Sequence, residues 1–486
     1  MEASKLLRGG RINSTKDEIV KYTSSVHYDQ RLLKQIIKIN QAHIIMMAEE
    51  GIVKKKDASK ILEALRQIKV TTIPDTFEDG HMFVEQRVID KVGQEIGGNL
   101  HIAKSRNDQV SAAIRMELRN ELLNLYNSMT SFQENLLESS KKHVLTIILG
   151  YTHIQPAQPI TYAHYLLSYV DALERDKERI IETYNRVNKS PMGAAALATT
   201  SFPINRERIA ELLGFDGLIE NSIDAVTTRD FILETFSTLS ILSTNICRFV
   251  EDLILWCSYE FDTIEIPSEF ASTSSIMPQK KNPELLEVIR ARTSQIMGDC
   301  VKVFLTLKGI PSTYNLDLQE ITSITWNSIS VMCDSLQLLS KLVCQIKIKD
   351  MSQRAIATFS TATELANLLV RDYKISFRTS HKIVGALIRE ITDKKLSSKK
   401  ITPKLLAETA KKISNIRLNI TQENILSALE PKNFVKAHDV KGGPAPKEVK
   451  RMIKERKKQL NNDKDWVKKQ NFSLKEKKIF NYNSLL

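Results

Sequence analysis

The sequence predicts an all-α protein built on a central bundle of long helices. Glycine and proline, which often interrupt helices, are both absent from four long stretches, residues 99–149, 160–190, 218–266 and 312–384. In two of them apolar residues recur every three or four positions, as on one face of a helix. These are Val110, Ile114, Leu118, Leu122, Leu125, Met129, Phe132 and Leu136, and Ile232, Phe236, Leu239, Leu242, Ile246, Phe249, Leu253 and Trp256. A helix of about 35 residues reaches roughly 50 Å, and it cannot bury its own stripe, so several must lie side by side.

We expect this bundle to span residues 108–350, with further units on either side. A mixed helical region, residues 1–107, precedes it, and a small domain of shorter helices, residues 351–455, follows it. The lysine-rich residues 456–486 are expected to form a basic tail, as a solvated helix or a partly disordered arm. Because no motif lies in this tail, its removal from about residue 460 should leave activity largely intact.

The composition is that of a water-soluble globular protein, with 42% hydrophobic and 26% charged residues. No apolar run is long enough to span a membrane, and the N-terminus lacks the apolar core of a secretory signal. The five cysteines are odd in number and show no C-x-x-C spacing. Reduced thiols in a cytoplasmic protein are therefore expected, and neither a disulfide framework nor a zinc site.

The positive charge of the chain is concentrated at its C-terminus. Residues 441–486 contain 14 Lys and Arg against 5 Asp and Glu, a net charge of 14 − 5 = +9 out of +13 for the whole chain. A basic tail of this kind gives non-specific attraction to phosphates and little more. Nucleic acid is therefore not an expected partner.

The first motif, HIAKSRNDQV (residues 101–110), stands at the start of the first long stretch. Ser105, Asn107 and Asp108 are all good N-cap residues, so the motif predicts helix capping. A second interpretation stays open, in which Arg106, Asn107 and the helix N-terminus form an anion site, since exposed N–H groups favour a carboxylate there.

The second motif is GYTHIQPAQP (residues 150–159), a polar stretch braced by glycine and proline. It carries Thr152 and His153. A histidine in such a rigid loop is a candidate for proton transfer because its pKa lies near working pH, whereas most histidines are surface or core residues. No H-E-x-x-H, P-loop or G-x-G-x-x-G motif is present, so neither a metal nor a nucleotide cofactor is expected.

The third motif is STSSIMPQKKNPE (residues 272–284), which lies between two stretches expected to be helical. Ser274 or Ser275 can act as a nucleophile or a base if nearby cations and N–H donors stabilise its anion, and Lys280, Lys281 and the loop amides can do so. Asn282 offers donors to a carboxylate, and Glu287, one turn into the next helix, can orient a histidine. The loop is either a cationic lid that closes over an acid or an ordinary turn between helices.

Together these stretches resemble a known family. TSSIMPQKKNP resembles the signature G-S-S-x-M-P-x-K-x-N-P of the fumarase/aspartase superfamily, with Thr273 in place of the leading glycine. HIAKSRNDQ, GYTHIQPAQP, LKGIPSTYNLDLQE and the N-terminal GGRI…SSVHYD are similar to the pattern of argininosuccinate lyases. The resemblance covers roughly residues 7–450. It implies a three-domain, all-helical fold that assembles into a homotetramer, with three subunits contributing to each site.

The resemblance also implies a chemistry. Argininosuccinate is split reversibly into arginine and fumarate, the last step of arginine biosynthesis, by loss of a Cβ proton through an aci-carboxylate carbanion, without cofactor or metal. Ser274 is then the base, Lys280 and Asn282 stabilise the carbanion, and His153, oriented by Glu287, takes part in proton transfer. The division of acid and base roles between Ser274 and His153 stays open. Binding of the succinyl carboxylates is implied for Arg106, Asn107 and Thr152, and binding of the arginine end for Ser25, Asp29, Tyr314 and Gln319.

The chain departs from the family pattern at a few positions. Ile102 and Ala103 replace a common Thr-Gly pair, Ala194 and Ala195 replace Ser-Gly, and Thr322 stands where many members carry a lysine that contacts the arginine half. Two rival hypotheses remain: a catalytically silent relative, as in the lens crystallins of this family, and another succinyl-nitrogen lyase. The presence of the candidate acid, base and lid lysine favours an active enzyme.

Overall fold

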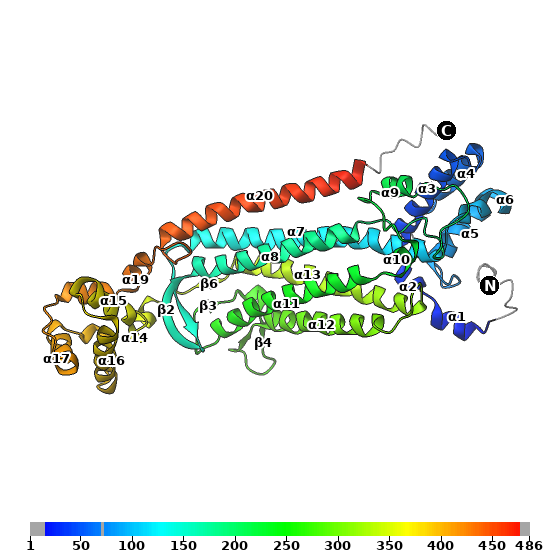
Figure 1. Ribbon diagram of the computed structural model, residues 1–486. Coiled ribbons are helices and arrows are strands. Elements are labelled where there is room, and N and C mark those ends of the chain that lie inside the picture. Colours follow the sequence, from blue (N-terminus) through cyan, green and yellow to red (C-terminus); the bar gives the residue numbers. More distant parts are fainter. Residues whose placement is uncertain (1–14, 70–71, 477–486) are drawn as a thin grey trace.

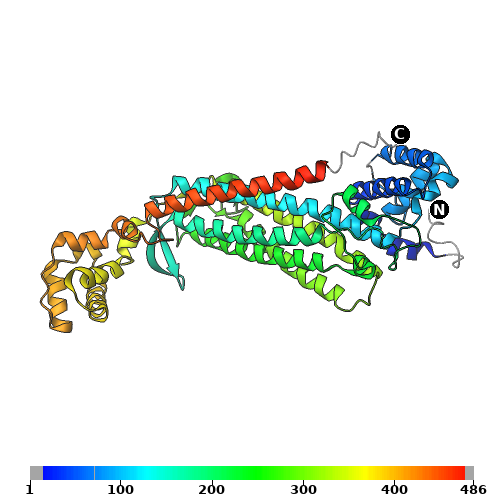
Figure 2. The ribbon, with the colours of Figure 1, turned by 45° about the horizontal axis from the view of Figure 1, so that its top comes forward.

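The computed structural model of the protein describes residues 15–69 and 72–476. A bundle of long helices forms the centre, with a helical unit at one end and a small helical domain at the other (Figure 1), and the arrangement is elongated in both views (Figure 2). The bundle helices are α7 (Arg106–Lys142), α8 (Tyr162–Val187), α11 (Asp230–Trp256), α12 (Glu284–Leu307) and α13 (Glu320–Val343).

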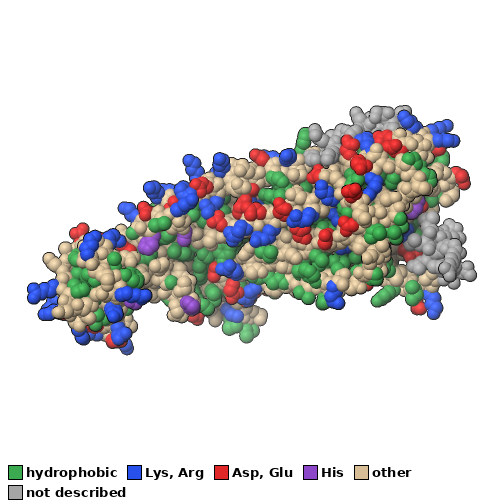
Figure 3. All heavy atoms as spheres, viewed as in Figure 1, with side chains coloured by type: hydrophobic (Ala, Val, Ile, Leu, Met, Phe, Trp, Pro, Cys, Tyr) green, Lys and Arg blue, Asp and Glu red, His purple; other side chains and the backbone are tan. Residues whose placement is uncertain are grey.

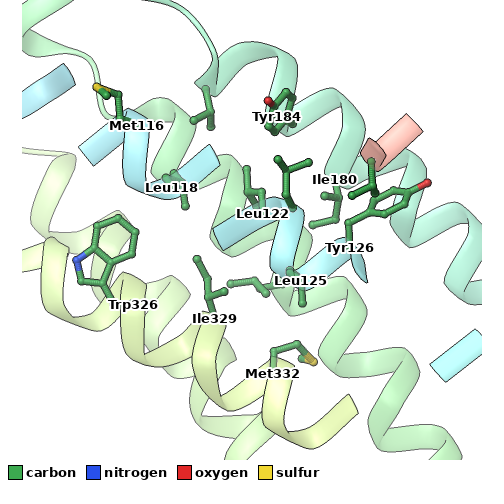
Figure 4. Close-up of a cluster of buried hydrophobic side chains, with 14 of the residues drawn as sticks. Met116, Leu118, Leu122, Leu125, Tyr126, Ile180, Tyr184, Trp326, Ile329 and Met332 are labelled. Carbon is green, nitrogen blue, oxygen red and sulfur yellow. The ribbon is translucent and has the colours of Figure 1, made fainter. Parts of the chain in front are cut away.

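The apolar stripes predicted from the sequence form the core of this bundle. Every residue of the two stripes is buried except Val110, which is partly buried. Figure 4 shows Leu122 and Leu125 of α7 between Ile180 of α8 and Ile329 and Met332 of α13. The prediction of an all-α protein with a long-helix bundle is confirmed, because each helix buries its stripe only against its neighbours.

The N-terminal unit packs against the start of α7. It contains α1 (Asp17–Thr23), α2 (Val26–Asp29), α3 (Leu33–Glu49), α4 (Lys55–Arg66), α5 (Gly80–Val92), α6 (Gln94–Gly97) and the 3-10 helix η2 (Gly98–His101). Helix α3 contacts α7, and also α9 (Arg206–Leu213), which lies with α10 (Ser222–Thr227) in the connection between α8 and α11. Residues 1–14 of the predicted N-terminal region, with the GGRI motif, lie outside the described residues.

The small domain at the other end has its own hydrophobic core, drawn from residues 365–429. Its helices are α14 (Ser352–Ala357), α15 (Ala362–Tyr373), α16 (Phe377–Asp393), η5 (Ser398–Lys400), α17 (Pro403–Ser414), α18 (Gln422–Leu429) and α19 (Pro431–Ala437). Prolines stand at the first position of α17 and α19, where a missing N–H costs nothing.

Three antiparallel strand pairs complete the described fold. They are β1 (Ile147–Thr152) with β2 (Gln155–Thr161), β3 (Ile264–Glu265) with β6 (Lys347–Ile348), and β4 (Ser272–Thr273) with β5 (Lys281–Asn282). Short 3-10 helices lie at η3 (Ser268–Phe270) and η4 (Leu316–Gln319). The second motif, expected to be a loop, is thus most of a two-stranded hairpin, whose edges tolerate Pro156 and Pro159.

The C-terminal helix α20 (Pro446–Glu476) differs most from the sequence-based expectation. Instead of a free tail, residues up to Glu476 lie along α7 and α8. Leu460 and Val467 are buried there, and the Trp466 ring lies 4.8 Å from that of Tyr126. Lysine and arginine side chains lie along the outer face of α20 (Figure 3). Because these residues dominate the sequence of the segment, its apolar face was not recognised from the sequence. Residues 477–486 lie outside the described residues.

Two further observations concern membrane-spanning helices and the state of the cysteines. Among residues 15–69 and 72–476, no helix combines the length and apolar character needed to cross a membrane. All five cysteines are free.

Candidate active site

A cavity of about 330 Å³ lies where the N-terminal unit meets the bundle. It brings together six of the residues predicted to bind substrate, from segments far apart in the chain. These are Ser25, Asp29, Arg106, Asn107, Tyr314 and Gln319. The cavity is large enough for a small molecule that carries both positive and negative groups.

Asp29 forms the acidic wall of the cavity. Its Oδ2 atom accepts a hydrogen bond from the Ser25 hydroxyl at 2.8 Å and another from the Gly80 N–H at 3.0 Å. A side chain at position 80 would meet Ile36 at 2.9 Å, so glycine permits this approach. Burial raises the pKa of Asp29 to about 6, against the lowering effect of these hydrogen bonds. The carboxylate is thus suited to bind a cationic group, which would replace the lost water.

Arg106 and Asn107 stand at the first turn of α7, opposite Asp29. The capping prediction is confirmed, because the Ser105 hydroxyl accepts the Asn107 N–H and the Asp108 side chain accepts the Ser105 N–H. Arg106 forms an ion pair with Asp79. The Asn107 side-chain amide donates to the carbonyl of Ala196 at 3.0 Å. The capped first turn of α7 thus also forms part of the cavity wall through Arg106 and Asn107. That these residues bind an anion stays a prediction.

The third wall comes from the segment before α13. Tyr314 is partly buried, and burial raises the pKa of its phenol. The Gln319 amide donates to the carbonyl of Thr23 at 3.4 Å, which joins this wall to the N-terminal unit. Thr322 also lines the cavity, and its short neutral side chain leaves this wall without a lysine.

The sequence analysis missed the acidic and histidine side chains Glu78, Asp79 and His81 of the cavity. Asp79 caps α5 by accepting the Met82 N–H at 2.8 Å. His81 is buried, which lowers its pKa to about 3 and keeps the ring neutral. The only signal was the cluster Glu-Asp-Gly-His at a helix start, which capping alone explains.

Thr152 and His153 lie at the tip of the β1–β2 hairpin, where both side chains are exposed. The turn residues His153 and Ile154 have φ values of 54° and 58°. This left-handed conformation is unfavourable for a β-branched residue such as Ile154. Strained turns of this kind are concentrated at functional sites.

The third motif forms a loop closed by the β4–β5 ladder. Inside it, the Ser274 hydroxyl oxygen accepts hydrogen bonds from the N–H groups of Ile276 (3.4 Å) and Met277 (3.2 Å). Such donors stabilise negative charge on an oxygen. Lys281 lies 3.8 Å from Glu265, whereas the described residues offer Lys280 no ion pair and its side chain is exposed.

Within a single chain, the cavity lies far from both the β1–β2 hairpin and the loop of the third motif. Helix α7, with 37 residues, separates Arg106 from the hairpin by about 55 Å. Helix α12, with 24 residues, separates the loop from the segment that holds Tyr314 by about 36 Å. His153 and Glu287 are both exposed, and no contact between them is found among the described residues. One chain therefore does not bring the predicted catalytic and binding residues together.

Comparison with known proteins places the fold among lyases. The structure of EDDS lyase in complex with formate matches with a TM-score of 0.87 at 30% identity, covering 98% of this chain and 97% of that one. Class II fumarase from Schistosoma mansoni has the same fold, with a TM-score of 0.71 at 16% identity over 84% of this chain and 91% of that one. The family model described as "Lyase" matches residues 10–298. The fold and the cavity thus define a lyase of the fumarase/aspartase superfamily.

The sequence narrows the class further. Residues 359–436 match the family model "Argininosuccinate lyase C-terminal". The argininosuccinate lyase of Methanocaldococcus jannaschii is 46% identical over 457 residues, covering 92% of this chain and 93% of that protein. That of Methanosarcina mazei is 41% identical over 463 residues, covering 94% of each. The chain belongs to the argininosuccinate lyase family, and the resemblance inferred from the motifs is confirmed.

Proposed function

We propose that the protein eliminates fumarate from argininosuccinate and releases L-arginine, as the final step of arginine synthesis. The observation that carries this proposal is the 46% identity to an argininosuccinate lyase over nearly the whole chain. The cavity supports it, since its acidic and cationic walls suit a substrate with groups of both signs. The free cysteines fit an enzyme that works in the cytoplasm.

We assign the two halves of the substrate to different groups of residues. Asp29, held by Ser25, binds a cationic group of the arginine half, and Tyr314 and Gln319 donate hydrogen bonds to its carboxylate. Arg106, Asn107 and Thr152 bind the carboxylates of the succinyl half. These roles follow from charge, because carboxylates attract N–H and O–H donors and cations attract the buried acid.

The third motif supplies the chemistry. Ser274 removes the proton from Cβ, and the electrons of that bond spread into the adjacent carboxylate as an aci-carboxylate dianion. Lys280, Asn282 and the loop N–H groups stabilise this charge. The electrons then form the double bond of fumarate while the bond from Cα to the guanidino nitrogen breaks. His153, oriented by Glu287, delivers a proton to the leaving nitrogen.

We further propose that the active enzyme is a homotetramer with sites built from three subunits. Within one chain the cavity lies about 55 Å from the hairpin and about 36 Å from the loop, so other copies must supply these two elements. Exposed large apolar side chains on α11, α12 and α13 provide a surface for association. They are Ile241, Val288, Val301, Phe304, Leu305 and Leu338.

The activity is tested by following the absorbance of fumarate with purified protein. Argininosuccinate should release fumarate, and adenylosuccinate should not. Release from adenylosuccinate alone would support the hypothesis that the protein is another succinyl-nitrogen lyase. No release from either substrate, with the protein folded, would support the catalytically silent relative.

A further inference from the structure

Arg229, the residue directly before α11, is buried with much of its side chain unused. It is 3% exposed. Its Nη1 atom donates to the carbonyls of Thr228 (2.8 Å) and Val226 (3.3 Å), but Nε and Nη2 have no hydrogen-bond partner. No carboxylate within the described residues forms an ion pair with it. Buried polar groups are normally satisfied, so these N–H groups are expected to serve a partner that binds later.

Two other buried arginines show that this is unusual here. Arg119 uses both Nη atoms, on Asn188 and on the carbonyls of Leu213 and Gly214. Arg115 donates to two carbonyls and stacks on Phe231 with its guanidinium carbon 3.8 Å from the ring centre. In each of these, only Nε is an unpartnered buried nitrogen. Arg229 alone of the three also has a fully buried Nη atom without a partner.

Arg229 is coupled to Tyr314, the residue on the third wall of the cavity. The two segments are joined by a hydrogen bond of 2.9 Å from the Thr313 N–H to the Thr227 hydroxyl. Burial raises the pKa of Tyr314, and the Arg229 guanidinium opposes that rise more than any other charge. Arg229 does not line the cavity itself, whereas Tyr314 does. Arg229 is therefore placed beside the segment that carries Tyr314, outside the residues that line the cavity.

We infer that Arg229 is a positioning residue for Tyr314, and that the pair recognises the α-carboxylate of the arginine half of the substrate. The unused N–H groups of Arg229 donate to the phenol oxygen when substrate binds, so the phenol proton points at the carboxylate. The remaining side chains on this wall, including Gln319 and Thr322, are neutral, and Arg106 is assigned to the succinyl half. The inference rests on the proposed function.

The reverse reaction tests it, because arginine and fumarate then bind as separate molecules. Arg229→Gln should raise KM for arginine about 10-fold or more, the range of a hydrogen bond to a charged group. KM for fumarate and kcat should each change less than about threefold, since the Arg229–Tyr314 pair is assigned to the arginine half. Arg229→Lys keeps the charge and should restore part of the arginine affinity. Tyr314→Phe should match Arg229→Gln, and the double variant should be no worse than either single one.

Arg119→Lys is the matched control, since it alters an equally buried arginine away from the cavity. It should lower the melting temperature without changing KM for arginine. An unchanged KM for arginine in Arg229→Gln, equal changes for both substrates, or additive effects with Tyr314→Phe would overturn the inference. If Arg229→Gln does not fold, the same two measurements, KM for arginine and its additivity with Tyr314→Phe, are made on Arg229→Lys and on its double variant with Tyr314→Phe. A parent protein with no activity would instead refute the proposed function.

Discussion

Lys177 of α8 and Asp463 of α20 form an ion pair in which the side chains are only 1% and 5% exposed. Glu174 is a second partner of Lys177, at 2.9 Å. A buried charge is costly when its partner is lost. The pair therefore makes the C-terminal helix an integral part of the bundle, although its sequence resembles a solvated basic tail.

Loss of this helix segment should destabilise the protein. Deleting residues from 460 onward removes Leu460, Asp463 and Trp466 from the core and should reduce both the melting temperature and the activity. Asp463→Ala alone should lower the free energy of unfolding by about 3 kcal/mol, as measured by urea denaturation. The control is Asp465→Ala, whose ion pair with Lys468 is exposed and should contribute less than about 0.5 kcal/mol. Full activity and an unchanged melting temperature after the deletion would show that α20 is dispensable there.

The lid hypothesis predicts that Ser274 and Lys280 act on the transition state. Ser274→Ala should lower kcat by about 100-fold or more while KM changes little. Lys280→Met should behave in the same way, because the developing dianion loses its cation. Lys281→Met is the matched control, since Lys281 is near Glu265 and should affect turnover far less. If the loop is only a turn between helices, all three variants will keep near-normal kcat.

Binding of arginine should depend on pH through Asp29. Its pKa of about 6 in the folded state lies above the ordinary 3.8. The protonated form therefore stabilises the fold at low pH, and this stabilisation is lost as pH rises from about 4 through 6. Binding of a cation needs the ionised form, so KM for arginine should rise about tenfold per pH unit below 6 and level off above it. Asp29→Asn should bind weakly at every pH from 5 to 8; an unchanged pH profile in this variant would contradict the assignment.

Shared sites should allow two inactive variants to restore each other. Tetramers mixed from Ser274→Ala and Asn107→Ala subunits should recover up to about a quarter of the parent activity, because a site needs an intact loop and an intact Asn107 from different chains. The control mixture, Ser274→Ala with Lys280→Met, should recover none, since both changes fall in the same loop. Failure of the first mixture in verified mixed tetramers would contradict sites shared between subunits.

Two positions where the family pattern has glycine carry alanine in a left-handed conformation. The φ values of Ala103 and Ala195 are 60° and 52°. Replacing either by glycine should raise the free energy of unfolding by about 0.5–1 kcal/mol, because strain is relieved. Ala407→Gly, in the middle of α17, should instead lower it by about 1 kcal/mol. Thermal unfolding of the three variants checks this; a loss of stability at position 103 or 195 would show that the strain is negligible.

Much of the fold could be predicted from the sequence because its signals are local. The stripe through Leu118, Leu122 and Leu125 specifies one face of α7 whatever surrounds it, and the residue pattern of the N-cap at Ser105 specifies where the helix begins. The motif residues of the family could be identified in the same way. The hairpin at Thr152 was missed because two prolines and a strained turn contradict ordinary strand propensities.

The sequence by itself thus determined the helix class, the family and the chemical types of the residues proposed for the reaction. Only the tertiary structure decided how they are distributed: Asp79 and His81 line the cavity, Arg229 is buried beside the segment that holds Tyr314, and the hairpin and loop lie far from the cavity along rigid helices. The same holds for α20, where burial of Asp463 depends on Lys177 nearly three hundred residues earlier in the chain. Residues close together in the sequence determine periodicity and capping. A site or a buried ion pair depends instead on long-range packing that no local pattern encodes.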